Sequence, residues 1–180
     1  MTITIRPAAR DEAPVVAALS IAGWRETYAG HIGAPYLAAL DRHPKHDVAS
    51  WETRFAATDR RHWTFVAALD TPVGFVHCRE SADVPGHRSE IWRLYILRRA
   101  HGRGIGRALM DVAARTLEAN GLAPFALWVL EFNAGARAFY ERLGGTLIGR
   151  QSFPLADTTA LEVAYGWVSA ASMSPRGSHP

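Results

Sequence analysis

The chain has 180 residues and a formal net charge of +3, with 48% hydrophobic and 21% charged residues. This length fits one domain with a sizeable core, and we expect a single domain over residues 1–170 and a flexible tail over 171–180. The modest charge argues against a nucleic-acid partner, and no apolar run approaches the length of a membrane span. The lone cysteine, Cys78, excludes an internal disulfide and agrees with a cytoplasmic location.

Apolar periodicity and glycine, proline and asparagine signals predict alternating strands and helices. The predicted strands cover residues 2–6, 63–69, 73–80, 90–97, 125–130, 146–152 and 161–167. The predicted helices cover residues 11–28, 35–40, 45–57, 104–120 and 133–143. The resulting order is β-α-α-β-β-β-α-β-α-β-β, in which the two short helices at 35–40 and 45–57 are counted together and follow a break at Gly30 and Gly33.

The most informative segment is a glycine-rich turn between the strand at 90–97 and the helix at 104–120. It reads Arg98-Arg99-Ala100-His101-Gly102-Arg103-Gly104-Ile105-Gly106-Arg107. The first turn of a helix has N–H groups without intrahelical acceptors, and the helix dipole adds partial positive charge there. Glycine lets the backbone come close to an anion because it has no Cβ. The pattern predicts a polyphosphate site, with a plain connecting turn as the alternative.

Two common phosphate-binding motifs do not fit this turn. A nucleotide P-loop closes with Lys and Ser or Thr, whereas this turn continues Gly106-Arg107-Ala108. The dinucleotide motif needs Gly-x-Gly-x-x-Gly and an acidic residue after a following parallel strand, and the glycines here alternate instead.

The chain resembles the GCN5-related N-acetyltransferase (GNAT) superfamily over roughly residues 3–168. The family pyrophosphate motif, Gln/Arg-x-x-Gly-x-Gly/Ala, matches Arg99 to Gly104. A second pattern, Asn followed by a helix with Ala-x-x-x-Tyr-x-x-Leu-Gly-Phe, matches Asn133 to Gly145, with Gly145 in place of Phe. The resemblance implies an α/β (α+β) fold with a single mixed, mostly antiparallel sheet of about seven strands and helices on both faces.

The resemblance also implies acetyl-CoA as cofactor and transfer of its acetyl group to a primary amine. In the family the turn binds the pyrophosphate, the fourth strand splays from the fifth to pair with the pantetheine amides, and an Asn also contacts that arm. Asn133 has a second interpretation as a helix N-cap. The implied cofactor-binding residues are Leu94, Tyr95, Ile96, Arg99, Gly102, Arg103, Gly104, Ile105, Gly106, Arg107, Asn133 and Tyr140.

Amine acetylation requires two proton transfers, and the resemblance suggests one residue for each. A lysine-like amine has a pKa of about 10.4, so a base must take its proton, and the leaving thiolate needs an acid. Tyr140 matches the family acid, with a packed ring as the alternative. Glu90 matches the family base, acting through water, with a surface ion pair to Arg88 as the alternative. Trp128 stands where other family members carry a fifth-strand Glu.

The acceptor side is less defined. Trp24 and Tyr28 are candidates for an acceptor wall or a core aromatic cluster, and His77 for substrate binding or a structural role. We expect no metal site and no covalent role for Cys78, hence direct attack in a ternary complex. The acceptor is expected to be a small-molecule amine. A protein or peptide amine and a non-catalytic coenzyme A sensor are the alternatives, and the family also makes a homodimer plausible.

Overall fold

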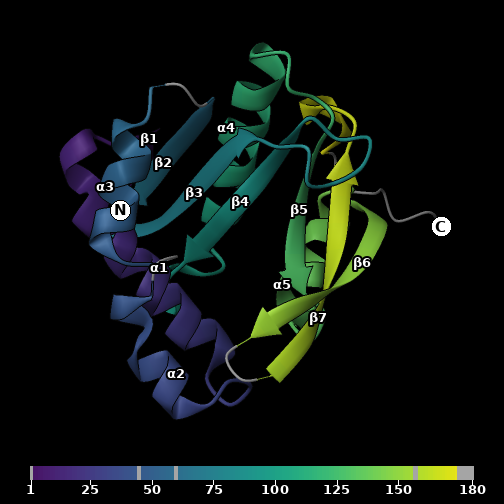
Figure 1. The fold of residues 1–180 in the computed structure, drawn as a ribbon. Helices are drawn as coiled ribbons and strands as arrows, with labels where there is room; N and C mark the ends of the chain where they lie inside the picture. The colour runs from purple at the N-terminus through teal and green to yellow at the C-terminus, as the bar shows by residue number, and fades with distance from the viewer. Residues whose placement is uncertain (1, 44–45, 59–60, 156–157, 174–180) are drawn as a thin grey trace. The chain divides into compact units, whose positions relative to one another are not determined.

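The computed structural model describes residues 2–43, 46–58, 61–155 and 158–173. Its seven strands form one mixed sheet in the order β1-β2-β3-β4-β5-β7-β6 (Figure 1). The strands are β1 (Thr4–Pro7), β2 (His62–Ala68), β3 (Pro72–Glu80), β4 (Ser89–Ile96), β5 (Phe125–Leu130), β6 (Thr146–Leu155) and β7 (Thr158–Trp167). β4 pairs with β5 in parallel, whereas β1 with β2, β5 with β7 and β6 with β7 are antiparallel. The predicted fold class is confirmed.

The helices also follow the predicted order. They are α1 (Ala13–Tyr28), α2 (Ala34–Ala38), α3 (Val48–Ala56), α4 (Ile105–Ala119) and α5 (Ala134–Arg142), with 3-10 turns η1 (Arg10–Glu12), η2 (Leu40–Arg42), η3 (Arg98–Ala100) and η4 (Ala170–Ser172). α3 begins at Val48 because the Asp47 carboxylate accepts the N–H of Ser50 at 2.6 Å as an N-cap. Residue 45 of the helix predicted over 45–57 lies outside the described residues.

The last two strands are longer than the sequence predicts. β6 and β7 pair from Thr146–Gly166 to Leu155–Thr158, so each extends beyond its apolar core. Backbone pairing with a neighbouring strand continues these strands where alternation of apolar residues has stopped. At the C-terminus, η4 and the buried Met173 occupy the first part of the predicted tail, and its remainder lies outside the described residues.

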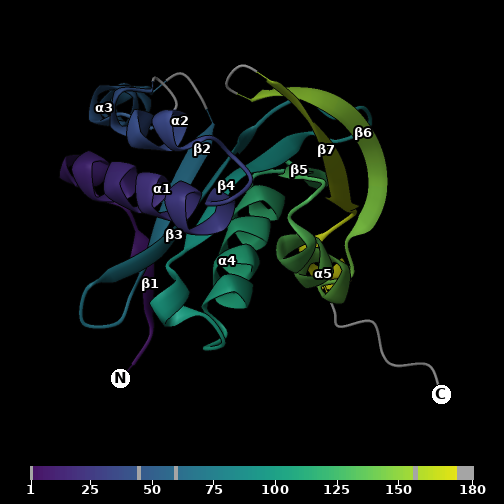
Figure 2. The same cartoon turned by 90° about the horizontal axis from the view of Figure 1, so that it is seen from below.

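The chain divides into two compact units, so the single domain expected over 1–170 stays a prediction. The first unit comprises residues 1–77 and 93–110. Within it α1 and α3 lie side by side (Figures 1 and 2). The fully buried ring of Trp51 on α3 meets the rings of Phe75 and His77 on β3, with centroids 5.5 and 5.4 Å away. α1 reaches the sheet at Gly23, where a Cβ would lie 2.6 Å from the Tyr95 ring.

The second unit comprises residues 78–92 and 111–180. Its core joins α5 to one face of β5 and β7, where Phe125 stacks on Trp167 at 5.6 Å between centroids. Trp167 also explains the departure from the family pattern. A Cβ at Gly145 would lie 2.7 Å from the Trp167 ring, so the indole fills space next to Gly145. The loss of the family Phe is therefore matched by a large ring on β7.

Candidate active site

The glycine-rich turn runs from η3 into the first turn of α4. Gly102 and Gly104 have φ values of +73° and +77°, a left-handed conformation that glycine adopts without steric cost. The first intrahelical bond of α4 runs from Ala108 N to Gly104 O at 3.1 Å. A Cβ built at Gly102 or Gly104 would meet no atom within 4 Å. The backbone on this side of the turn therefore faces open space, as an anion cradle requires.

The turn is fastened to three neighbouring segments. His101 Nε2 lies 2.8 Å from the Ile96 carbonyl oxygen and can donate to it at the end of β4. The main-chain N–H of Arg98 donates to the Glu26 carboxylate on α1 at 2.6 Å. Arg99 reaches Thr71 and Pro72 with longer contacts of 3.4 Å. These contacts hold the turn in shape without a ligand.

Positive side chains surround the turn in the positions that the sequence predicts. Arg99 and Arg103 are exposed, and Arg107 in the first turn of α4 is half-buried. Open glycine backbone, a helix N-terminus and exposed guanidinium groups together suit a pyrophosphate. The residues present therefore fit the polyphosphate part of acetyl-CoA.

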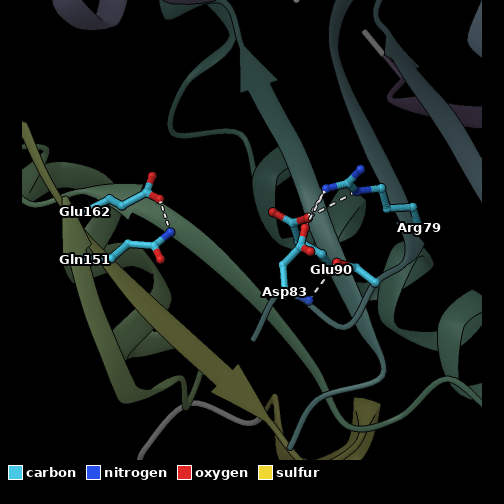
Figure 3. A network of polar contacts seen from close by, with 6 residues as sticks. Arg79, Asp83, Glu90, Gln151 and Glu162 are labelled. Carbon is cyan, nitrogen blue, oxygen red and sulfur yellow. Dashed lines mark hydrogen bonds and ion pairs between the residues drawn. The ribbon is translucent and has the colours of Figure 1, made fainter. Parts of the chain in front are cut away.

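Glu90 lies buried near the start of β4, with its side chain 8% exposed (Figure 3). Arg79 on β3 donates to Glu90 Oε2 from Nε at 3.1 Å and from Nη2 at 2.8 Å. Arg79 also bonds Asp83 at 3.1 Å, and its guanidinium lies 5.2 Å from the centre of the Trp92 ring. The carboxylate is therefore buried rather than at the surface and has Arg79 as a guanidinium partner, whereas an ion pair with Arg88 stays a prediction.

The strand register puts Glu90 and Tyr140 on opposite faces of the sheet in the second unit. Glu90 is opposite Ala126, whereas Phe125 is opposite Trp167 on the other face by strand alternation. The Tyr140 ring belongs to the face of Trp167, with centroids 6.2 Å apart. The two candidate proton-transfer groups thus approach the sheet from different sides.

Tyr140 and Asn133 belong to the segment that forms α5. Tyr140 is 7% exposed, and its ring meets those of Phe139 and Tyr165 with centroids 5.3 and 6.0 Å away. The Tyr140 ring is therefore packed against neighbouring rings, and this packing is compatible with a catalytic role for its hydroxyl. The Asn133 side chain accepts the N–H of Ala136 at 3.2 Å, which confirms its interpretation as an N-cap.

The Acetyltransferase (GNAT) family profile matches residues 24–145. The chain belongs to this family. An uncharacterised N-acetyltransferase of Bacillus subtilis is 26% identical over 170 residues, 92% of each chain, and a probable N-acetyltransferase of Mycobacterium tuberculosis is 31% identical over 150 residues, 82% of each. The crystal structure of PaiA N-acetyltransferase from Thermoplasma acidophilum in complex with coenzyme A shares the fold, with a TM-score of 0.74, 19% identity, and coverage of 93% of this chain and 100% of that one.

This GNAT protein is therefore an N-acetyltransferase, and its acetyl donor is acetyl-CoA, the donor that the family uses. Among the residues that the structure describes, no group of three or more His, Cys, Asp or Glu side chains is placed to hold a metal ion. None of the described helices combines the length and the apolar character needed to cross a membrane.

The predicted acceptor-side residues of the acetyltransferase lie in the core of the first unit. Trp24 and Tyr28 are 4% and 7% exposed, and their rings meet edge to face at 4.6 Å. His77 is 2% exposed, and its Nδ1 lies 2.8 Å from the Thr64 hydroxyl. These positions favour the core interpretation, and contact with an acceptor stays a prediction for all three.

The backbone of Leu94 to Ile96 forms the end of β4. Among the described residues, the register of β4 with β5 consists of Ser89 opposite Phe125 and Glu90 opposite Ala126. On the β3 side the approach is close, because a Cβ at Gly74 would lie 2.7 Å from the Tyr95 carbonyl oxygen. Burial raises the pKa of the Tyr95 phenol above its usual value.

Sequence reasoning did not find two polar pairs that the acetyltransferase places in its second unit. The partnership of Arg79 with Glu90 depends on the hairpin register, which the Ser81 N to Arg88 O bond of 3.1 Å sets. The second pair is Glu162 on β7, 8% exposed, which accepts from Gln151 Nε2 on β6 at 2.6 Å (Figure 3). Glu162 stands opposite Leu130 and so shares the face of Glu90. Strand alternation around 161–163 could have indicated an inward carboxylate there.

Proposed function

We propose that this acetyltransferase transfers the acetyl group of acetyl-CoA to a primary amine of a small molecule by direct attack in a ternary complex. The observation that carries the proposal is β4 itself. Near its start it holds a buried carboxylate, Glu90, and at its end it feeds an open, preorganised glycine turn with positive φ at Gly102 and Gly104. The candidate proton acceptor and the candidate phosphate cradle thus lie at the two ends of one strand in the sequence.

We assign different parts of acetyl-CoA to different residues of the chain. The N–H groups of the turn and of the α4 N-terminus receive the pyrophosphate, together with the side chains of Arg99, Arg103 and Arg107. The backbone groups of Leu94 to Ile96 and the side chain of Asn133 are proposed to receive the pantetheine arm.

Glu90 is the proposed base. At pH 7 only about one lysine-like amine in a thousand is neutral, so removal of a proton limits the supply of nucleophile. Arg79 holds Glu90 Oε2 in place with two hydrogen bonds and compensates the charge that burial would otherwise penalise. A positioned carboxylate can then accept the ammonium proton directly or through one water.

Tyr140 is the proposed acid, which protonates the leaving thiolate through its hydroxyl. Its ring is fixed by Phe139, Tyr165 and Trp167, and such packing restricts the directions in which the hydroxyl can point. The base and the acid serve successive steps of an addition–elimination at the thioester carbonyl: Glu90 takes the proton of the attacking amine, and Tyr140 gives a proton to the thiolate that leaves when the tetrahedral intermediate collapses.

Direct attack is favoured over a covalent acetyl-enzyme at cysteine. Cys78 has no exposed surface, so its thiol is not positioned to meet a thioester. The small-molecule acceptor is proposed ahead of a polypeptide because Trp24 and Tyr28 are buried in the core, where they offer no broad aromatic surface to a peptide.

The test is thiol release from acetyl-CoA with a panel of acceptors, followed by mass spectrometry of the products. We expect release that depends on small primary amines and stops with their N,N-dimethyl analogues, which have no N–H to replace. Release with lysine peptides alone would favour the protein or peptide acetyltransferase. Binding of acetyl-CoA without release for any amine would favour the non-catalytic sensor.

A further inference from the structure

The end of α1 and the start of η3 cap each other across 72 positions of sequence. Glu26 Oε2 accepts the main-chain N–H of Arg98, the first N–H of η3, at 2.6 Å. In return, Arg98 Nη2 donates to the main-chain carbonyl of Glu26 at 2.7 Å. Glu26 lies in the last turn of α1, where carbonyls have no intrahelical donor. The Glu26 carboxylate therefore lies at the N-terminal end of η3, and the Arg98 guanidinium lies at the C-terminal end of α1. Each charge has the sign that favours that end of a helix.

We propose that Glu26 is a positioning residue for acetyl-CoA, an inference that rests on the assignment of the pyrophosphate to the glycine turn. Glu26 fixes the N-terminal end of the turn at Arg98. The first intrahelical bond of α4 fixes the other end at Gly104, and His101 fixes the middle through the Ile96 carbonyl. A loop already held in its binding conformation loses less entropy when the ligand binds, which raises affinity.

The contacts with Glu26 distinguish Arg98 from the other arginines of the turn. Its guanidinium donates to the Glu26 carbonyl of α1 at 2.7 Å, whereas Arg99 makes only longer contacts of 3.4 Å with Thr71 and Pro72. Arg98 is therefore the arginine of the cluster that is bound to the scaffold by a short hydrogen bond, and Arg99 and Arg103 are the ones proposed to contact the anion.

The sign of a substitution effect separates positioning from simple charge. Glu26 is an anion that contacts the start of a turn proposed to bind a polyanion. Charge alone therefore predicts that removal of Glu26 strengthens acetyl-CoA binding. Positioning predicts the opposite, because the N–H of Arg98 and the start of the turn lose their anchor. The two explanations cannot both account for a weaker complex.

The experiment is calorimetric titration of acetyl-CoA into the folded wild-type protein and its Glu26→Ala and Glu26→Gln variants at one ionic strength. We expect Glu26→Ala to weaken binding about three- to tenfold, the range that the net contribution of one hydrogen bond gives. Glu26→Gln should lose less, because its amide oxygen can still accept the N–H of Arg98.

Glu12→Ala is the matched control in the same unit. Glu12 also accepts a main-chain N–H at a 3-10 turn, that of Ala9 at 2.8 Å, and pairs with an arginine, Arg6, at 2.6 Å. The control changes the net charge identically and should leave acetyl-CoA binding unchanged or slightly stronger.

Unchanged or tighter binding by Glu26→Ala would overturn the inference while leaving the proposed function intact. Equal weakening in Glu26→Ala and Glu12→Ala would also overturn it, since the loss would then be general. A wild-type protein that does not bind acetyl-CoA would remove both the inference and the assignment of the turn.

Discussion

At the scale of single residues, the chemistry depends on two side chains whose surroundings differ. Glu90 is a buried carboxylate with a guanidinium partner, and Tyr140 is a buried phenol among aromatic rings. Neither environment follows from the family motif alone. Arg79 lies on a separate strand, and Trp167, which contacts Tyr140, lies near the end of the described chain.

Tyr140→Phe should lower kcat by about 10- to 10³-fold and leave acetyl-CoA binding nearly intact. The substitution removes the hydroxyl and keeps the ring that packs against Tyr165 and Trp167. Steady-state kinetics with a reactive amine, together with acetyl-CoA titration, measure the two effects separately. A kcat within about twofold of wild type would leave the tyrosine with packing alone.

Glu90→Gln should lose rate at neutral pH and recover part of it as the pH rises. The amide can still accept from Arg79, but it cannot take the ammonium proton, and the neutral amine becomes more abundant at higher pH. The measurement is kcat/KM against pH for both proteins. Parallel profiles separated by less than about threefold would assign Glu90 to a structural ion pair with Arg79.

At the scale of elements, the glycine turn is the part of the molecule most directly specified by sequence. Alternating glycines before an amphipathic helix predict a backbone that an anion can approach closely, and the structure has open space at Gly102 and Gly104. The positive φ values of these two glycines come from the structure. The contacts that hold the turn were not predictable, because Glu26 and Thr71 are distant in sequence and carry no local signal.

Gly104→Ala should weaken acetyl-CoA binding about tenfold, equivalent to about 1.4 kcal/mol. The added methyl group would occupy the open side of the turn, and the residue would have to keep a positive φ. Gly121→Ala is the matched control, since Gly121 has φ +70° and similarly open surroundings at the far end of α4.

Titration of both folded variants with acetyl-CoA gives the comparison. Both should lose stability by about 1 kcal/mol from the backbone strain, but only Gly104→Ala should lose affinity. Equal affinities in the two variants would contradict binding of the pyrophosphate at Gly104.

The start of the chain has a pH-dependent anchor between β1 and η1. The hydrogen bond from Arg6 is the largest factor that lowers the pKa of Glu12, from 4.5 to about 2. The unfolded chain therefore binds more protons than the folded chain between these values, and this contribution to stability is lost as the pH falls from about 4.5 to about 2.

Thermal unfolding between pH 2 and 5 tests this anchor in wild type and in Glu12→Gln. We expect the variant to show a shallower fall of Tm with acidification, because it has no carboxylate to protonate. Identical slopes would show that Arg6 and Glu12 do not couple to unfolding, as many exposed pairs do not.

At the scale of the whole molecule, the order of elements and the family could be predicted, whereas the surroundings of the acceptor could not. Periodicity and glycine signals identify strands and helices because both are local properties of the sequence. The sequence favoured substrate and core equally for Trp24 and Tyr28 and favoured a structural role for His77, and only long-range packing decides that all three are buried. The pairs Arg79–Glu90 and Gln151–Glu162 likewise depend on strand register.

The central claim is direct transfer from acetyl-CoA to a primary amine, and initial-rate kinetics test it most directly. Thiol release is measured while acetyl-CoA and a reactive small amine are varied against each other. A ternary complex predicts double-reciprocal lines that intersect, in keeping with the fully buried Cys78. Parallel lines, which report a covalent acetyl-enzyme, or thiol release that does not depend on the amine would contradict the account.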